Sequence, residues 1–179
     1  MGGEHGGRRL HFPDGRGLRP TADRVRETLF NWLQGELSER CVLDLFAGSG
    51  ALGLEALSRG AARVTFVERA RPVALQLQKN IDLLGLRDRT RVETRDAERF
   101  LGREPGESYD LVFLDPPFAD RLLGPVCRQL EASGCLASPA WIYLEQDSSQ
   151  AWPELPPNWQ LHREGQAGQA AFRLLRRSG

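Results

Sequence analysis

Short apolar runs and helix-like patterns alternate along most of the 179-residue chain. Runs rich in branched and aromatic residues are typical of buried strands, and apolar residues spaced every three or four positions are typical of amphipathic helices. We expect strands at residues 41–46, 63–67, 90–94, 109–114 and 141–145. We expect helices at 51–59, 72–84, 97–101 and 122–130, and an earlier helix that Thr21 or Asp23 caps and that runs to about residue 37.

This alternation predicts an α/β fold in which a parallel sheet carries helices on both faces. The last two apolar segments, 160–163 and 170–175, are separated by the glycine-containing stretch 165–168 and predict a hairpin at an antiparallel edge. We therefore expect a Rossmann-like, seven-stranded, mostly parallel sheet with an antiparallel C-terminal hairpin, in one domain over residues 21–179. Residues 1–20 are rich in glycine and arginine and are expected to form a separate arm or hairpin.

The composition is that of a globular protein, with 40% hydrophobic and 27% charged residues, which argues against disorder. The apolar runs are too short to cross a bilayer, and the N-terminus lacks the apolar core of a signal peptide, so we expect a cytoplasmic protein without membrane contact. The three cysteines form no CxxC pair and show no zinc-like spacing. We expect buried free thiols and no bound metal.

Charge is unevenly distributed although the net charge is zero. Basic residues prevail before residue 104 and after residue 159, and acidic residues prevail between them. Every basic residue except Lys79 is arginine, whose planar guanidinium suits phosphates and base edges. A biased genome composition would give the same arginine usage, so charge alone does not identify a partner.

The first expected strand leads through the loop Asp44-Leu-Phe-Ala-Gly-Ser-Gly50 into a helix. Glycines let the backbone approach a ligand closely, and the helix start presents free N–H groups. Gly48, Gly50 and Gly53 also fit the GxGxxG dinucleotide pattern, with the acid Glu68 after the next strand. However, a carboxylate at Asp44 would repel a pyrophosphate and suits a ligand that ends in an ammonium group, such as S-adenosylmethionine (SAM). A plain turn between strand and helix is the alternative.

Two acids at the ends of the next strands would complete a SAM site, because the C-terminal ends of parallel strands share one edge of the sheet. Glu68 can accept from both ribose hydroxyls, and Asp96 can accept from the adenine amino group. A solvated strand-end charge is the alternative for Glu68, and a helix N-cap is the alternative for Asp96. The expected cofactor-binding residues are Asp44, Phe46, Ala47, Gly48, Ser49, Gly50, Glu68, Arg69, Asp96, Ala97 and Asp115.

The fourth expected strand ends in Asp115-Pro-Pro-Phe118. Two consecutive prolines fix an extended backbone and remove two N–H donors, so the Pro116 carbonyl has no local donor. With the Asp115 carboxylate, this carbonyl forms a fork of two acceptors that matches the two hydrogens of an exocyclic amine on a nucleobase. Phe118 offers a face on which a flipped-out base can stack, worth about 1–3 kcal/mol. We expect Asp115, Pro116, Pro117 and Phe118 to form the catalytic site; a rigid loop in which Asp115 caps a turn is the alternative.

These motifs are similar to those of SAM-dependent amino-methyltransferases with a [DNS]PP[YFW] signature, and the chain resembles the bacterial 16S ribosomal RNA guanine-N2 methyltransferases. The resemblance is found in the stretches 18–32, 44–59, 113–118, 162–164 and 167–169. The sequence departs from the family pattern at Gly6, which stands at an arginine position, at Ala22, which replaces a hydroxyl residue, and at Ala119 and Asp120, where the family tends to be basic.

The resemblance implies a class I methyltransferase fold and transfer of a methyl group from SAM, leaving S-adenosylhomocysteine, to N2 of guanine 966 in 16S rRNA. It implies 16S rRNA as the partner, within a 30S subunit or an assembly intermediate; we expect a monomer. The arginines expected to contact rRNA are Arg8, Arg9, Arg19, Arg24 and Arg26. Arg24 and Arg26 could equally hold their helix over the cofactor, or all five could form a solvated face.

Two other functions stay open from the sequence. An amino-methyltransferase for adenine N6, cytosine N4 or a protein amide would use the same acceptor fork. An RNA-binding module without catalysis, or a nucleotide-binding oxidoreductase, would share the glycine loop, but the intact tetrad at 115–118 argues against both.

Overall fold

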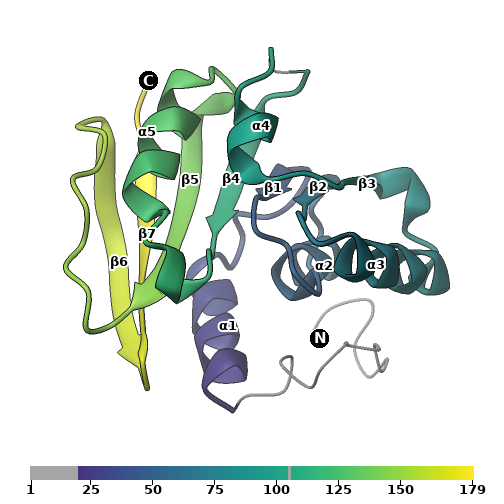
Figure 1. Ribbon diagram of the computed structural model, residues 1–179, viewed down its shortest axis with the longest axis horizontal. Coiled ribbons are helices and arrows are strands. Elements are labelled where there is room, and N and C mark those ends of the chain that lie inside the picture. Colours follow the sequence, from purple (N-terminus) through teal and green to yellow (C-terminus); the bar gives the residue numbers. More distant parts are fainter. Residues whose placement is uncertain (1–19, 105) are drawn as a thin grey trace.

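A single seven-stranded sheet forms the centre of the protein in a computed structural model that describes residues 20–104 and 106–179. The strand order is β3-β2-β1-β4-β5-β7-β6 (Figure 1). Strands β1 to β5 are parallel, and β7 is antiparallel to both of its neighbours. The α/β class, the seven strands and the antiparallel C-terminal hairpin are therefore confirmed. The predicted arm at 1–20 lies almost entirely outside the described residues.

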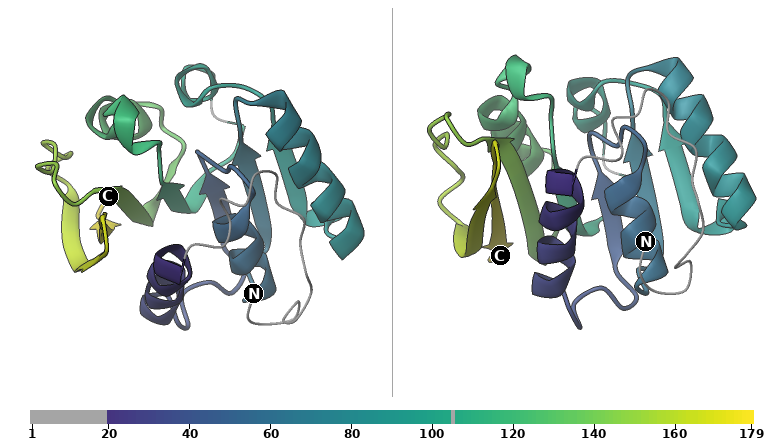
Figure 2. Two further views of the ribbon diagram at one scale, coloured as in Figure 1. Left: turned by 60° about the horizontal axis from the view of Figure 1, so that its bottom comes forward. Right: turned by 90° about the horizontal axis from the view of Figure 1, so that it is seen from below.

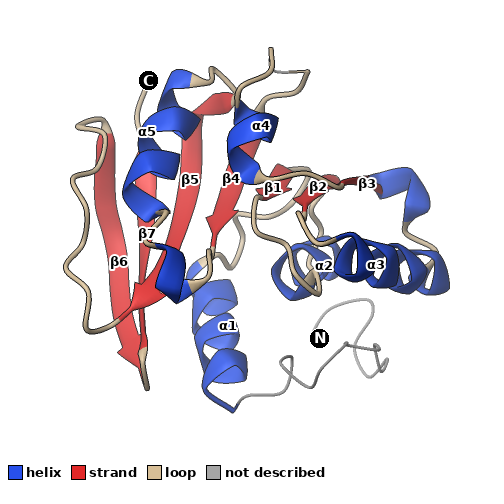
Figure 3. Ribbon diagram, in the orientation of Figure 1, coloured by secondary structure: helices blue, strands red, loops and turns tan. Residues whose placement is uncertain are grey.

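Helices and strands alternate along the chain up to β5 (Figure 3). The strands are β1 (Cys41–Asp44), β2 (Arg63–Val67), β3 (Thr90–Glu93), β4 (Tyr109–Leu114), β5 (Leu136–Asp147), β6 (Trp159–Ala167) and β7 (Ala170–Arg177). The α-helices are α1 (Pro20–Trp32), α2 (Ala51–Ser58), α3 (Arg71–Leu84), α4 (Ala97–Leu101) and α5 (Leu123–Ala132). Short 3-10 turns occur at η3 (Arg87–Arg89) and η4 (Phe118–Asp120).

Helix α1 ends at Trp32, so the predicted end near residue 37 is wrong. Leu33 and Leu37 continue the apolar pattern and are buried, but they follow the helix in a turn. Gly35 adopts a left-handed φ of 83° within this turn. The four-residue spacing of these two buried leucines therefore has the period of a helix, although the helix has already ended.

The last three strands are longer than predicted. Strand β5 already begins at Leu136, although Ser138 and Pro139 are exposed and interrupt the apolar pattern. Gly165 lies inside β6 and not in a connecting loop. Glycine is needed at this strand position because a Cβ there would come within 2.7 Å of the Phe172 ring on β7. The hairpin turn is confined to Gly168 and Gln169.

Side chains from the two faces of the sheet form two hydrophobic clusters. Helices α1, α2 and α3 cover one face, whose cluster includes Phe113 of β4 and Tyr143 of β5. Helices α4 and α5 cover the other face, whose cluster includes Leu114 and Leu144 (Figure 2). Because side chains alternate along a strand, Glu145 follows Tyr143 toward the α1 side.

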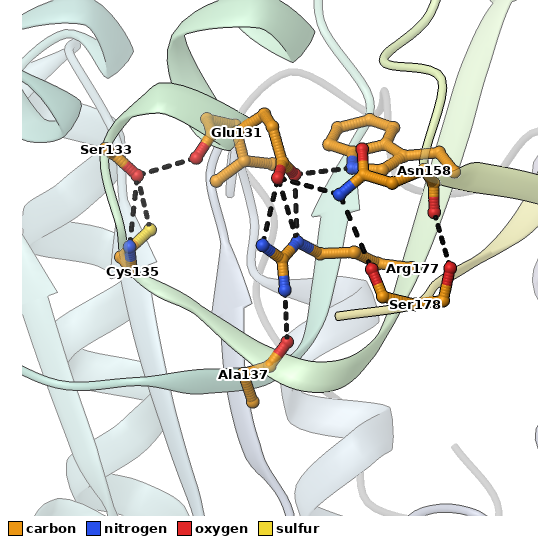
Figure 4. Close-up of polar contacts among 9 residues, drawn as sticks. Glu131, Ser133, Cys135, Ala137, Asn158, Arg177 and Ser178 are labelled. Carbon is orange, nitrogen blue, oxygen red and sulfur yellow. Dashed lines mark hydrogen bonds and ion pairs between the residues drawn. The ribbon is translucent and has the colours of Figure 1, made fainter.

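An ion-pair cluster fastens the C-terminal strand to α5 (Figure 4). The Arg177 guanidinium donates to both carboxylate oxygens of Glu131, from Nε and Nη2, at 2.9 Å each. Trp159 Nε1 and Asn158 Nδ2 donate to the same carboxylate at 2.7 and 2.9 Å, and Arg177 Nη1 reaches the Ala137 carbonyl at 3.2 Å. The cluster lies near the N-terminal end of β5, because Arg177 pairs with Ala140 in the sheet.

The three cysteines are free, as predicted, and Cys127 and Cys135 are buried, but Cys41 is only half-buried, so the prediction that all three are buried is wrong for Cys41. Burial raises the pKa of Cys127 to about 12, so this thiol is inert at neutral pH. Within the described ranges, no group of three or more His, Cys, Asp and Glu side chains is arranged to hold a metal ion. The helices of the same ranges are all too short or too polar to cross a membrane.

Candidate functional site

The C-terminal ends of the parallel strands open into a cavity of about 1010 Å³. This is at the upper end of the range of about 300–1,000 Å³ that is typical of small-molecule sites. Its walls come from the segments that follow β1, β2, β3 and β4, from the end of β5 and from α1. The predicted site residues that line it are Asp44, Phe46, Ala47, Gly48, Ser49, Glu68, Arg69, Asp96, Ala97, Asp115, Pro116, Pro117 and Phe118. The sheet topology thus brings the separate motifs together.

The glycine loop needs its glycines for two different reasons. Gly48 and Gly50 adopt left-handed φ angles of 53° and 79°, which residues with a Cβ rarely adopt. Gly50 is the N-cap of α2, and a Cβ there would collide with Leu77 and come within 3.3 Å of Phe66. Gly50 therefore allows the turn to pack against Leu77 and Phe66 in the core, whereas Gly48 lines the cavity.

Glu68 holds the glycine loop to the end of β2. Its Oε2 accepts from the Gly48 N–H at 2.9 Å, and its Oε1 accepts from the Ala70 N–H at 2.7 Å. Each carboxylate oxygen keeps a second lone pair for a ligand donor. A carboxylate held in this way faces the cavity ready to accept two hydroxyl hydrogens.

Asp44 is a buried acid at the end of β1, with only 2% of its surface exposed. Burial raises its pKa to about 7; the hydrogen bond from the Gly53 N–H, at 3.1 Å, opposes the rise, and the negative charge of Glu68 adds to it. A carboxylate that is costly to ionise in the free protein is stabilised when a cationic ligand group approaches it.

Asp96 is the N-cap of α4, since its Oδ1 accepts from the Arg99 N–H at 2.8 Å. The capping role considered from the sequence is therefore confirmed. Asp96 also lines the cavity next to Ala97, so the cap fixes the side chain at the rim. A second acceptor oxygen stays available for a ligand amine.

The tetrad after β4 forms the wall opposite the β2 and β3 loops. Pro116 is buried and Pro117 is exposed. Phe118 packs against the cluster on the α1 face, and its carbonyl accepts from Gln150 Nε2 at 3.1 Å. Burial raises the pKa of Asp115 well above its usual value, and the charges of Glu145 and Asp44 raise it further.

Glu145 and Tyr143 are site residues that the sequence did not reveal. Glu145 lines the cavity from β5, and the Tyr143 hydroxyl donates to its Oε2 at 2.8 Å. Burial raises the pKa of Glu145, although the hydrogen bond from Tyr143 acts in the opposite direction. Leu114 at the end of β4 pairs with Leu144, so Asp115 directly after β4 and Glu145 in β5 each come one residue after this pair. The sequence alone shows Glu145 only as a charged residue at the end of an apolar run; its place beside β4 in the sheet identifies it as a site residue.

Helix α1 closes the cavity beside the tetrad through Ala22, Val25 and Arg26. Arg26 Nη2 pairs with Asp23 at 3.0 Å, while Arg24 is exposed to solvent. Arg26 therefore lines the cavity, and the expected roles of Arg24 and Arg26 stay predictions. Arg8, Arg9 and Arg19 lie outside the described residues.

Exposed Arg69 at the end of β2 forms an ion pair with Asp120 of η4, with 3.5 Å between Nη2 and Oδ2. This pair links the loop that holds Glu68 to the segment that holds Phe118. Because both partners are solvent-exposed, the link contributes little to stability, and a charged ligand could replace either partner.

Comparison with known proteins identifies relatives along almost the whole chain. Residues 1–176 match the family model described as Conserved hypothetical protein 95. “Ribosomal RNA small subunit methyltransferase D” of Escherichia coli K12 is 50% identical over 177 residues, which cover 99% of this chain and 88% of that protein. The Haemophilus influenzae protein of the same name is 42% identical, over 94% of this chain and 88% of that protein.

A solved structure shares the same architecture. “Putative methyltransferase yhhF” from Escherichia coli superimposes with a TM-score of 0.91 at 46% identity, covering 99% of this chain and 96% of that one. The expected Rossmann-like methyltransferase fold is therefore confirmed.

Proposed function

The chain belongs to the Conserved hypothetical protein 95 family, and from this premise we propose that it methylates the exocyclic N2 amine of one guanine, guanine 966, of 16S rRNA with SAM as methyl donor. The names of the Escherichia coli and Haemophilus influenzae relatives support methylation of small-subunit rRNA. The substrate would be the rRNA within a 30S subunit or an assembly intermediate. A cytoplasmic monomer is the form of the enzyme that we propose.

One observation carries the proposal: a single cavity joins the acceptor fork at Asp115 and Pro116 to the acids and glycine loop at the ends of β1, β2 and β3. Asp44 would face the ammonium group of SAM, Glu68 the ribose hydroxyls and Asp96 the adenine amine. The tetrad after β4 would then hold the target amine beside the cofactor. Phe118 would stack on the flipped-out base.

The residues would act mainly by alignment. Bound SAM supplies a methyl group on a positively charged sulfur, which keeps the bonding electron pair when the methyl group leaves. The Asp115 carboxylate and the Pro116 carbonyl hold the two N2 hydrogens and aim the nitrogen lone pair at the methyl carbon. As the N–C bond forms, N2 loses a proton, and Asp115 can accept it because burial raises the pKa of this carboxyl group and makes it a stronger base.

Replacement of Asp115 tests this role. We expect Asp115→Ala to lower kcat on small-subunit particles by about 100-fold or more, the usual size of a lost proton-transfer group. The Kd for SAM, measured by calorimetry, should change much less. Asp44→Ala should instead change mainly the Kd for SAM, with a large loss of SAM affinity. Wild-type turnover by Asp115→Ala would contradict the proposal.

A further inference from the structure

Glu145 is a cavity acid to which the mechanism above assigns no role. We propose that Glu145, oriented by Tyr143, accepts the N1–H of the target base and thereby selects guanine over adenine and cytosine. This inference rests on the proposed function, because it names the specificity determinant of the same site.

The position of Glu145 follows from the sheet. Asp115 and Glu145 each come one residue after the last paired residues of β4 and β5, Leu114 and Leu144, and adjacent strands lie about 4.8 Å apart. Both side chains line the cavity. The negative charge of Glu145 also contributes to the raised pKa of Asp115, after the larger effect of burial. A base amine held by Asp115 would therefore have its neighbouring ring nitrogen near Glu145.

Tyr143 fixes the orientation of the Glu145 carboxyl group. Its hydroxyl donates to Oε2 at 2.8 Å, which leaves Oε1 as the acceptor for a ligand. The Tyr143 ring is fully buried; it packs edge-on against Phe113, with 6.2 Å between ring centroids, and at a tilt against Phe172, with 6.4 Å between centroids. The donor is thus held in a rigid core, and the acid is oriented before a base arrives.

The acceptors match the Watson–Crick edge of guanine. Guanine presents three N–H hydrogens there, two on N2 and one on N1. The site offers three acceptors: the Asp115 carboxylate, the Pro116 carbonyl and the Glu145 carboxylate. Adenine and cytosine also carry an exocyclic amine, but the ring nitrogen beside it is an acceptor. That lone pair would face the Glu145 oxygen with no hydrogen between them. Two buried acceptors without a shared hydrogen are costly, so such a base would bind much more weakly than guanine.

The test changes the base without removing its amine. Small-subunit particles are reconstituted with 16S rRNA that carries either guanine or 2,6-diaminopurine at the target position; the second base keeps the N2 amine but has an acceptor at N1. We expect the wild-type enzyme to use the diaminopurine particle with a kcat/KM lower by about 100-fold or more, as for sites that lose a required hydrogen-bond donor.

The Glu145→Gln variant should largely remove this preference. The Tyr143 hydroxyl would hold the amide oxygen, so the amide NH2 would face the cavity and donate to N1 of diaminopurine. We expect activity on guanine to fall about 10- to 100-fold and the preference for guanine over diaminopurine to shrink to a few-fold or less. SAM affinity should stay unchanged, which separates a role in base recognition from a folding defect.

Glu131→Gln is the matched control, because it replaces an acid with the same amide near the N-terminal end of β5, away from Glu145. It should keep the wild-type preference for guanine. An equal kcat/KM of the wild-type enzyme on the two particles, or an unchanged preference in Glu145→Gln, would overturn the inference while methylation of the guanine particle still supports the proposed function. No methylation of guanine by the wild-type enzyme would instead defeat the proposed function itself.

Discussion

Asp44 shows how burial prepares a residue for a charged ligand. Its pKa of about 7 in the ligand-free protein means that it is only partly ionised at neutral pH. The ammonium group of SAM would stabilise the ionised form and lower this pKa. Ligand binding and proton release at Asp44 are therefore coupled.

We expect SAM binding to release a fraction of a proton near pH 7 and the affinity to weaken as the pH falls below about 7, because protonated Asp44 must first lose its proton. Calorimetry in buffers of different ionisation enthalpy measures the released proton directly. Asp44→Asn should bind SAM more weakly and lose this pH dependence. The same proton release in Asp44→Asn would assign the effect to another group.

Single residues differ in how well the sequence reveals them. Asp44, Glu68 and Asp115 stand directly at the ends of apolar runs, so a parallel sheet necessarily brings them to one edge. Asp96 was expected to accept from a ligand amine, with a helix cap as the alternative and both roles compatible, and the structure shows the cap. Glu145 follows an apolar run in the same way, but its meaning depends on its register with β4 and on the hydroxyl of Tyr143.

At the level of whole elements, the C-terminal hairpin depends on a polar connection. Glu131 in α5 receives hydrogen bonds from Arg177, Asn158 and Trp159. The hydrogen bonds from Arg177 are the largest of the causes that lower the pKa of Glu131 to about 2. Because this value lies below the usual carboxylate range, the cluster stabilises the fold while Glu131 is ionised and is lost in acid.

We expect Glu131→Gln to lower the free energy of unfolding at pH 7 by about 1–2 kcal/mol. This is the usual contribution of a charge-assisted hydrogen bond, reduced because the Glu131 side chain is 23% exposed and solvent screens its charge. The difference from wild type should shrink as the pH falls from about 4.5 to about 2, where Glu131 takes up its proton. Urea denaturation at several pH values measures both effects. A difference that stays constant over this range would show that the ion pair is not the cause.

Element types could be predicted more reliably than element ends. Strand β2 and helix α4 have the expected bounds, because a sharp change of pattern flanks each of them. The end of α1 could not be predicted, because buried Leu33 and Leu37 belong to the core without belonging to the helix. The extent of β6 depends on contact between Gly165 and Phe172, which only the folded hairpin creates.

For the whole molecule, the proposed binding of rRNA would depend on where the basic side chains lie, because the net charge is zero. Helix α1 lines the cavity through Arg26, and Arg24 of the same helix is exposed to solvent. A protein of this size presents few elements that can read a base sequence. We therefore expect the shape of the rRNA and contacts to its phosphates to guide binding.

We expect Arg24→Ala to weaken binding to small-subunit particles and to reduce the slope of log affinity against log salt concentration by about 1, as for loss of one phosphate contact. The Kd for SAM should be unchanged, because Arg24 is exposed. Arg87→Ala is the control, since exposed Arg87 precedes β3 at the far edge of the sheet. A salt slope equal to wild type in Arg24→Ala would place the rRNA elsewhere.

The most direct examination of the whole proposal is to identify the methylated atom. Small-subunit particles and naked 16S rRNA would be incubated with methyl-labelled SAM and the wild-type protein, and the product would be mapped and digested to nucleosides. We expect one labelled nucleoside, N2-methylguanosine, at a single position of 16S rRNA, and none with Asp115→Ala. Label on an adenine, a cytosine or a protein side chain, or no label on either substrate, would contradict a site built to hold the amine of guanine.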